Sequence, residues 1–293
     1  MRFLRLISFF IYFVLVVPIV ANSTIFEVHN LSTQMKNQMK KLKTWKADCP
    51  VPLERLRLIK FSYFDFNIQK QNNGQIIVLD AVSGRVIAIF KELYSLKFPI
   101  AKAKPIEYYK GNDEVSMTDN NTSSFNCREI TGGGLPSLHA YGVAIDINPI
   151  QNPYISFEET GNSVTILPCM GKEYFNRTNI RAGMVENIVN IFKKNGFTVW
   201  GGKWNTPIDW QHFQLPRGLA QLLAVMSPKD ATNFFEMVVI NKATLFESIK
   251  ANDNKFVELY KRNPKRFMQI FIEKPQLFNQ SPEIVMEFIS NGM

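Results

Sequence analysis

The sequence predicts an α+β protein: a small antiparallel sheet flanked by helices, with an α-helical extension at the C-terminus. Two observations support this prediction. Up to Pro216, short apolar stretches typical of strands alternate with stretches of helical periodicity, and turn-forming Gly, Asn and Pro residues separate them. After Pro216 only helical periodicity remains, with mixed charge and interrupting prolines. We therefore expect residues 45–216 to form one domain and residues 217–293 to form a helical extension.

The first part of the chain predicts a helix or linker, a hairpin and a second helix. Residues 22–44 are polar and lysine-rich with spaced apolar positions, which indicates a leading helix or a linker. The apolar, aromatic stretch 53–66 and the strand-like residues 76–79 flank the turn signal Gln-Asn-Asn-Gly at 71–74, so a hairpin is expected with its turn there. Residues 82–98 carry apolar side chains at helical spacing.

A long polar loop separates these elements from the rest of the domain. Residues 110–134 are rich in Asn, Asp, Ser, Thr and Gly. Loops of this length in a compact domain are either disordered or functional, and this one leads into the segment richest in reactive side chains, so we favour a functional loop. Strands are expected at 143–148, 197–200 and 210–215, and a helix at 181–195.

The N-terminus has the layout of an export signal. Two arginines precede a run of 16 chargeless residues at 6–21, and the small residues Ala21 and Ser23 offer a cleavage site. The alternative is an uncleaved membrane anchor, but the run is shorter than the roughly 20 residues needed to span a bilayer. Residues 1–21 thus predict an exported protein, periplasmic or extracellular, with membrane attachment through this segment as the alternative.

Net charge says little about partners. The formal charge is +9 and falls to +7 without the two arginines of residues 1–21. A basic exported protein is attracted to anionic cell-wall polymers or lipid head groups. The lysines and arginines are scattered and form no recognisable nucleic-acid-binding module, so no nucleic-acid partner is expected. The sequence does not indicate an oligomeric state.

Three cysteines follow the signal segment: Cys49, Cys127 and Cys169. In an oxidising compartment they allow one disulfide and one free thiol, and the sequence does not choose the pair. No C-x-x-C motif is present, which argues against a cysteine zinc site. Cys127 is better explained as a structural staple or buried thiol than as a nucleophile, because no histidine lies near it in the sequence.

Reactive side chains gather in two segments. His139 and Asp146 lie seven residues apart, with a glycine between them that allows a bend, and His212 follows three residues after Asp209. Two imidazoles and one carboxylate make a three-ligand zinc set with an open position, and a second carboxylate can act as a general base. Residues three apart on a straight strand face opposite ways, so a turn or bulge must intervene between Asp209 and His212. The competing interpretation is that the histidines are structural, as most lone histidines are.

A family resemblance favours the metal interpretation. The pattern S-x-H-x-x-G-x-A-x-D from Ser137 to Asp146, followed later by D-x-x-H from Asp209 to His212, resembles the M15 metallopeptidases. These include D-alanyl-D-alanine carboxypeptidases, vancomycin-resistance D,D-peptidases and phage L-alanyl-D-glutamate endopeptidases. The likeness covers roughly residues 45–216 and includes Cys-Pro-Val-Pro-Leu, Asn-Thr-Ser-Ser-Phe-Asn-Cys-Arg, Ile-Asn-Pro and Trp-Gly-Gly-Lys-Trp segments.

The resemblance implies the fold shared by D,D-peptidases and the hedgehog signalling domain. It implies one zinc ion held by His139, Asp146 and His212, with Asp209 as the general base. Glutamate is common at the base position of D,D-dipeptidases, whereas aspartate occurs in the endopeptidase and related branches, so Asp209 weakens the claim to one substrate.

Two further residues have roles that the sequence leaves open. The family implies that Arg128 contacts the developing oxyanion or the substrate carboxylate, while an arginine ending a polar loop is otherwise a solvated charge or an ion-pair partner. Ser137 either donates a hydrogen bond to the substrate or caps the local turn. The tryptophans at 200, 204 and 210 are expected to be scaffold.

The functional hypothesis is hydrolysis of a peptide bond in peptidoglycan stem peptides, with release of the terminal D-alanine as the first choice. An L-alanyl-D-glutamate-type endopeptidase would use the same metal chemistry. From a different class, the domain would be a catalytically silent wall-binding module, against which the complete ligand set and Asp209 argue.

Overall fold

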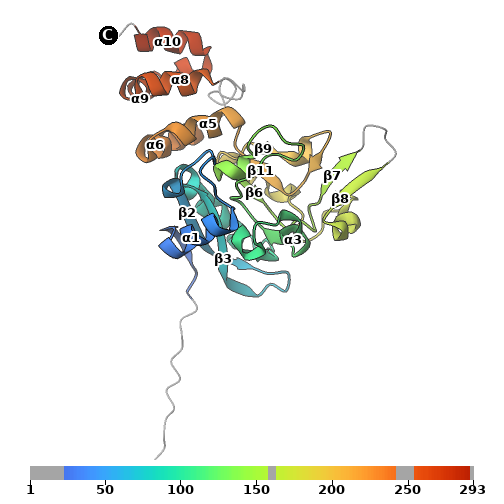
Figure 1. The fold of residues 1–293 in the computed structure, drawn as a ribbon. Helices are drawn as coiled ribbons and strands as arrows, with labels where there is room; N and C mark the ends of the chain where they lie inside the picture. The colour runs from blue at the N-terminus through green and yellow to red at the C-terminus, as the bar shows by residue number, and fades with distance from the viewer. Residues whose placement is uncertain (1–22, 158–162, 242–253, 291–293) are drawn as a thin grey trace, which may run out of the picture.

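The computed structural model describes residues 23–157, 163–241 and 254–290, and the predicted signal or anchor segment at residues 1–21 lies outside them (Figure 1). The strands are β1 (Phe26–Asn30), β2 (Leu56–Phe64), β3 (Lys70–Leu79), β4 (Lys102–Ala103), β5 (Asn121–Thr122), β6 (Ala144–Asp146), β7 (Tyr154–Phe157), β8 (Val164–Leu167), β9 (Val199–Trp200), β10 (Ile208–Asp209) and β11 (His212–Gln214). The helices are α1 (Thr33–Leu42), α2 (Ser83–Ser95), α3 (Asp113–Thr118), α4 (Val189–Lys194), α5 (Arg217–Val225), α6 (Pro228–Ile240), α8 (Lys255–Arg262), α9 (Pro264–Glu273) and α10 (Pro282–Ser290). In these segments no helix is both long and apolar enough to cross a membrane.

The α+β class is confirmed, but the strands form several small sheets instead of one. In the described segments, three sheets are antiparallel and three-stranded, with the orders β1-β2-β3, β10-β7-β8 and β6-β11-β9, and β4 pairs with β5 in parallel. The strands after residue 100 are short, with two to four residues each. Each of them pairs with one or two other strands. The likeness to a hedgehog-type fold stays a prediction.

The predicted hairpin is present, but its turn was placed wrongly. The turn lies between β2 and β3 at Asp65, whose Oδ1 accepts hydrogen bonds from the backbone N–H groups of Asn67 and Gln69, both at 2.9 Å. Gly74, in the expected turn, lies within β3 opposite Phe61. A Cβ at position 74 would come within 2.8 Å of the Phe61 ring, so this glycine serves close packing between strands and not a turn.

Helix α2 covers the first sheet and forms much of the core. The ring of Phe90 stacks on that of Phe61, with 3.8 Å between the centroids. Both side chains are buried, and burying a phenylalanine contributes about 1.5–3 kcal/mol to folding. The helix predicted at 82–98 is therefore confirmed. It forms because its apolar stripe packs on a sheet.

Three other predictions need correction. The leading segment contains the strand β1 as well as the helix α1, and the polar stretch 110–134 is mainly loop but includes α3 and β5. The helix expected at 181–195 is shorter: a 3₁₀ turn leads into α4. Gly183 has a φ of +80° and packs against Phe66, a conformation that excludes a helix at this position.

The C-terminal helices pack on the rest of the protein and extend from it (Figure 1). Buried Arg55 forms an ion pair with Asp80 and donates hydrogen bonds to the carbonyl groups of Leu223, at 3.2 Å, and Met226, at 2.6 Å, near the end of α5. These contacts satisfy carbonyls that a helix end leaves unpaired. Arg85 of α2 pairs with Glu236 of α6. The first two helices of the extension are thus anchored to the sheet domain.

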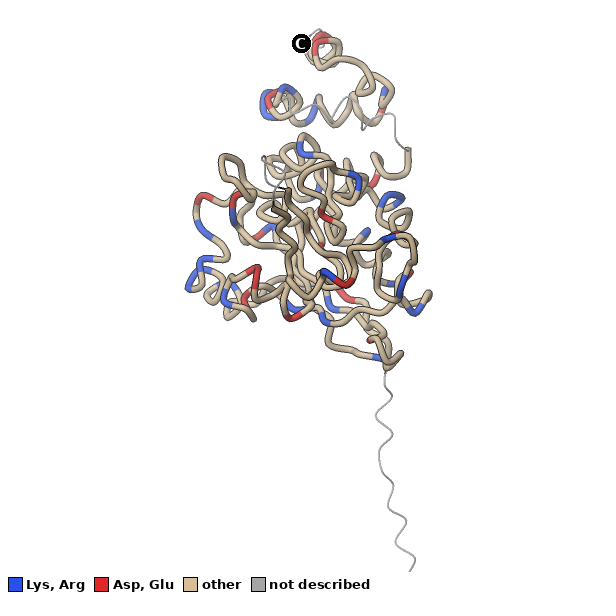
Figure 2. Tube along the Cα trace, turned by 90° about the vertical axis from the view of Figure 1, so that its right-hand side faces the viewer, with Lys and Arg blue, Asp and Glu red and all other residues tan. Residues whose placement is uncertain are grey.

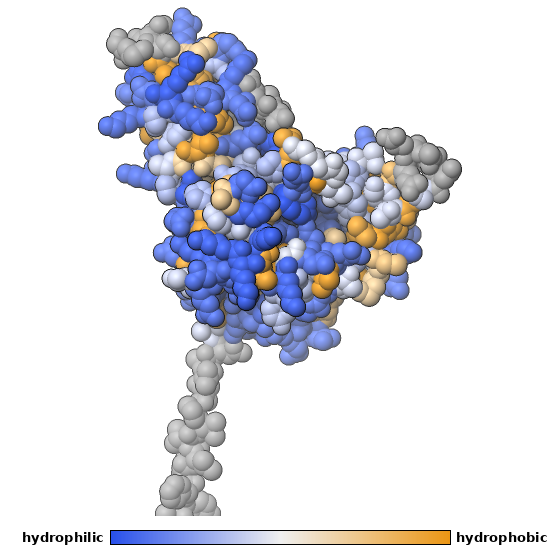
Figure 3. Space-filling view, in the orientation of Figure 1, coloured by the Kyte–Doolittle hydropathy of each residue, from blue (hydrophilic) through white to orange (hydrophobic). Residues whose placement is uncertain are grey.

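The surface is mixed in character. Figure 2 shows Lys and Arg residues distributed among Asp and Glu over the described segments. On the face drawn in Figure 3, apolar side chains gather near β7 and β8, where Phe157, Val164, Met170 and Phe175 are 41–51% exposed.

A disulfide joins Cys49 to Cys127 across a sequence separation of 78 residues, and Cys169 is free and exposed. The pairing left open by the sequence is thereby resolved, and Cys127 has the structural role expected of it. The bridge ties the segment before β2 to the loop that carries Arg128.

Replacing both bridged cysteines (Cys49→Ser with Cys127→Ser) should lower the free energy of unfolding by about 2–5 kcal/mol, because a crosslink closing a loop of this length restricts the unfolded chain. Denaturant unfolding of the protein measures this change. The matched control, Cys169→Ser, should change stability by less than about 0.5 kcal/mol. Equal stability of the double variant and the wild type would contradict the structural role.

Candidate metal centre

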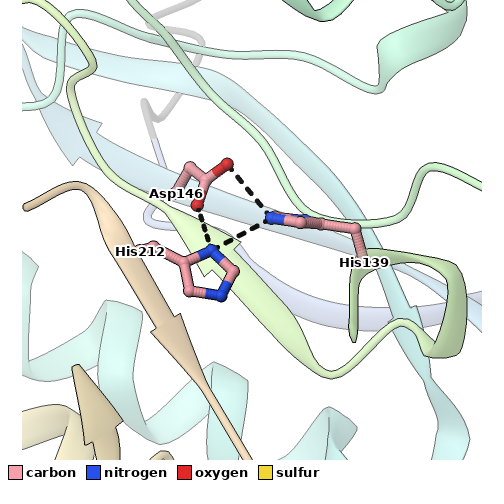
Figure 4. A group of neighbouring side chains, drawn as sticks. All are labelled: His139, Asp146 and His212. Atoms are coloured by element: carbon pink, nitrogen blue, oxygen red, sulfur yellow. Dashed lines mark hydrogen bonds and ion pairs between the residues drawn. The ribbon is translucent and has the colours of Figure 1, made fainter. Parts of the chain in front are cut away.

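Three side chains converge on one point: His139, Asp146 and His212 (Figure 4). One ligand atom from each lies within 4.8 Å of the others. Nε2 of His139 lies 3.2 Å from Nδ1 of His212, and the two carboxylate oxygens of Asp146 lie 3.1 Å and 2.9 Å from these nitrogens. Both histidines are buried. The sequence-predicted ligand set is thus brought together.

Strand pairing places two of these residues. In the antiparallel register of β6 and β11, His212 lies directly opposite Asp146. Residues opposite one another in such a pair have Cβ atoms about 4.5–5.5 Å apart, so their side chains meet on one face. Phe213, next to His212, is buried on the other face, where it stacks on Phe192 with 4.0 Å between centroids.

His139 comes from the 3₁₀ helix η4 (Leu138–Tyr141) that precedes β6. Ser137 caps this helix, since its Oγ accepts a hydrogen bond from the backbone N–H of His139 at 3.3 Å. Gly142 ends it with a φ of +68°, and a Cβ there would come within 2.7 Å of the Leu79 backbone nitrogen. The glycine of the motif is needed because the chain bends back beside β3 at this point.

The nitrogen of each ring that faces away from the centre has an acceptor. Nδ1 of His139 lies 2.5 Å from the carbonyl oxygen of Ser124, and Nε2 of His212 lies 2.7 Å from Oε1 of Gln214. A neutral imidazole that donates from one nitrogen presents a lone pair at the other. These two hydrogen bonds therefore direct a lone pair from each ring at the centre, as the outer partners of metal-binding histidines do.

The electrostatics of the centre favour a positive charge there. Burial opposes ionisation of Asp146, but the charges and hydrogen bonds of His139 and His212 outweigh it and lower the pKa of Asp146. Burial also opposes the charged form of His212, yet the hydrogen bond and charge of Asp146 raise its pKa to about 9. Either a bound proton or a bound cation supplies this positive charge.

The donor set fits a metal ion. Two neutral imidazole nitrogens and one carboxylate oxygen are the protein ligands of many catalytic zinc sites, which leave the fourth position open. The acceptors Ser124 and Gln214 complete the second layer of contacts that such sites require. The geometry thus favours metal binding over the interpretation that the histidines are structural.

Asp209 lines the same pocket as the three candidate ligands. It belongs to β10, which pairs with β7, whereas His212 belongs to β11 in a different sheet. The intervening residues Trp210 and Gln211 form a turn, so the change of direction anticipated from the sequence occurs as the chain passes between sheets.

The surroundings of Asp209 suit a base. Its Oδ1 is buried and has no hydrogen-bond partner among the described residues. Burial raises the pKa of Asp209 to about 6, with the Asp146 charge adding to the rise and the His212 charge opposing it. A carboxylate oxygen that lacks a protein partner is free to accept a proton from a molecule in the pocket.

Arg128 also lines the pocket and forms an ion pair with Asp113, the first residue of α3. Its side chain is 37% exposed, so the guanidinium is accessible from the pocket. The arginine is therefore an ion-pair partner, as one interpretation of the sequence has it. It also faces the site, as the other interpretation requires. Since the disulfide joins Cys127 directly before it, its backbone is held in place.

The pocket has a volume of about 370 Å³, within the usual range for small-molecule sites. Ser137 lines it, so a hydrogen bond to substrate stays a prediction beside its observed role as a cap. Of the three tryptophans, Trp200 and Trp210 form scaffold contacts with each other, as Trp200 donates to the Trp210 carbonyl. Trp204 lines the pocket beside His212, where its ring is placed to contact a bound molecule.

Several contributors to the site were missed from the sequence. Gln214 lies two residues after His212 on the same strand face, a spacing that would have indicated it. Asp113 begins a helix inside the polar loop. No pattern in the sequence indicated that its carboxylate would pair with Arg128. Ser124 acts through its backbone carbonyl, which no residue type reveals.

Comparison with known proteins adds independent support. Residues 131–215 match the family model described as D-alanyl-D-alanine carboxypeptidase of the M15 peptidases. The matched segment contains His139, Asp146, Asp209 and His212, while Arg128 lies just outside it. Neither curated proteins nor solved structures gave a match. The match over residues 131–215 supports an M15 family peptidase.

Proposed function

We propose that this protein is a zinc-dependent D-alanyl-D-alanine carboxypeptidase that removes the terminal D-alanine from peptidoglycan stem peptides. The family match supports peptidase activity on cell-wall peptides. The observation that carries the metal-dependent peptidase chemistry is the convergence of His139, Asp146 and His212 in one pocket with the unpartnered carboxylate oxygen of Asp209.

Zinc fits the donors better than magnesium or calcium. Imidazole nitrogen disfavours magnesium and calcium, which prefer oxygen ligands, and zinc accepts a mixed nitrogen and carboxylate set. When bound, the ion supplies a Lewis acid that polarises a carbonyl group and lowers the pKa of a water molecule.

Asp209 is proposed to act as the general base and then as the general acid. Its Oδ1 takes a proton from the attacking water and passes it to the amine of the leaving D-alanine. Its raised pKa suits both steps, because a catalytic acid–base group works best when its pKa lies near the operating pH. The aspartate side chain is short, and β10 brings it to the pocket wall from a separate sheet.

Arg128 is proposed to stabilise the negative charge that develops on the scissile carbonyl oxygen. Its ion pair with Asp113 orients the guanidinium, and the disulfide at Cys127 fixes the backbone beside it. A donor held in place before the reaction needs no reorganisation when the charge forms, which is the basis of oxyanion stabilisation.

We place this activity outside the cytoplasm, in the periplasm or the extracellular space. The charge and hydropathy pattern of residues 1–21 supports export, and so does the disulfide between Cys49 and Cys127, since such bonds persist mainly in oxidising compartments. Membrane attachment through residues 1–21 is the alternative to cleavage.

The test is release of free D-alanine from a purified pentapeptide stem by the zinc-loaded chain. Asp209→Asn should reduce kcat by about 10²–10⁴-fold while zinc content is unchanged, because it removes the proton acceptor and keeps the shape. Removing the metal with a chelator should abolish release, and adding zinc should restore it.

The other outcomes separate the competing functions. Cleavage inside the stem without D-alanine release would indicate the endopeptidase. Binding of cell wall with no cleavage by the zinc-loaded protein would indicate a silent wall-binding module. Full activity of Asp209→Asn would remove the proposed base.

Replacing Gln214 tests the outer layer of the metal site. Gln214→Leu removes the acceptor for Nε2 of His212 and should weaken zinc affinity by about 10–100-fold. The matched variant Gln214→Glu keeps an acceptor and should retain affinity within a few fold. Competition with a chromogenic zinc chelator measures both, and equal affinity for Gln214→Leu and wild type would show that this contact does not support the metal.

A further inference from the structure

Two arginines line the pocket, and they differ in their charge environment. Arg128 is paired with Asp113. Arg217, the first residue of α5, forms no ion pair with any carboxylate of the described residues, and the one hydrogen bond of its side chain to these residues runs from Nη1 to the carbonyl oxygen of Pro136 at 2.9 Å. Most of its donor groups are therefore available to a bound molecule, since a guanidinium has five N–H donors.

The place of Arg217 is fixed from two sides. It follows β11 closely, so the strand that carries His212 leads directly into it. Its hydrogen bond to Pro136 fastens it to the segment that precedes Ser137 and His139. Arg217 thus lies at the pocket wall between the two segments that supply the histidines.

The charge balance of the pocket also favours an anionic ligand. Asp113, Asp146 and Asp209 line it together with Arg128 and Arg217. With neutral histidines these groups leave one net negative charge, and a divalent cation reverses this to one net positive charge. Since Arg128 is compensated locally by Asp113, the excess positive charge away from the metal centre resides on Arg217.

We propose that Arg217 binds the free C-terminal carboxylate of the peptide substrate and so makes the site specific for removal of a terminal residue. A guanidinium and a carboxylate form two parallel hydrogen bonds, which gives both affinity and orientation. This inference rests on the proposed peptidase function and adds the residue that selects the substrate end. Arg217 lies beyond the segment that matches the family model.

A purely structural role is the competing explanation, because Arg217 also fastens Pro136. The two explanations differ in what the substrate must carry. A carboxylate-binding residue affects only ligands with a free carboxylate, whereas a residue that only supports the loop affects every ligand equally.

The experiment measures binding of acyl-D-alanyl-D-alanine and of its C-terminal amide to the zinc-loaded chain carrying Asp209→Asn, which slows turnover so that binding is measured before cleavage. The acid should bind about 10–100-fold more tightly than the amide, as expected for a hydrogen-bonded charge pair. Adding Arg217→Gln should reduce affinity for the acid to that for the amide and leave the amide unchanged within about threefold. Arg217→Lys, which keeps the charge and loses the fork, should fall between them.

Zinc content and thermal unfolding of each variant verify that the site is intact. Equal affinity of the Asp209→Asn protein for acid and amide would overturn the proposal, and so would an equal loss of affinity for both ligands on adding Arg217→Gln. Cleavage by the protein without these substitutions is measured separately. Acid-selective binding without D-alanine release would refute the carboxypeptidase function and leave the carboxylate site standing, whereas release without selectivity would do the reverse.

Discussion

The pairing of His212 with Asp146 across β6 and β11 is the constraint on which the site depends. Side chains alternate along a strand, so a slip of one residue would turn His212 into the core and Phe213 into the pocket. Burial of Phe213 against Phe192 opposes that slip, and therefore hydrophobic packing on one face fixes the geometry of the candidate metal ligands on the other. The hydrogen bonds at the ring nitrogens that face away from the centre then orient the two imidazoles. The resulting cluster of lone pairs and negative charge favours binding of a cation.

The sequence indicated much of this because the information is local. Residue type and spacing indicated His139, Asp146 and His212 as candidate metal ligands. Helical periodicity predicted α2 and the C-terminal helices. Prediction from the sequence failed where contacts between residues distant in the chain determine the structure. The glycine in the expected turn is required by the Phe61 ring on the neighbouring strand, while the Asp65 carboxylate makes the real turn by accepting hydrogen bonds from two backbone N–H groups. The path of the chain between Asp209 and His212 depends on two separate sheets, which no local pattern specifies.

The C-terminal helices contribute to the site as well as to the core. Amphipathic periodicity shows that a helix is buried on one side but does not name its partner. The structure shows that α5 is held at its end by Arg55 and contacts the loop before His139 at its beginning, through Arg217. One helix thus links the first sheet to the pocket. The disulfide has a similar effect on the other arginine of the pocket, because it fixes the chain directly before Arg128.

The central claim is that two histidines and one aspartate hold a zinc ion. X-ray absorption at the zinc edge of the loaded chain tests this most directly. The account predicts nitrogen and oxygen ligands at about 2.0–2.2 Å, with the outer scattering of two imidazole rings and no sulfur. A sulfur ligand at about 2.3 Å would contradict it and point to Cys169, the free cysteine of the described residues. Absence of imidazole scattering would equally exclude His139 and His212 as ligands.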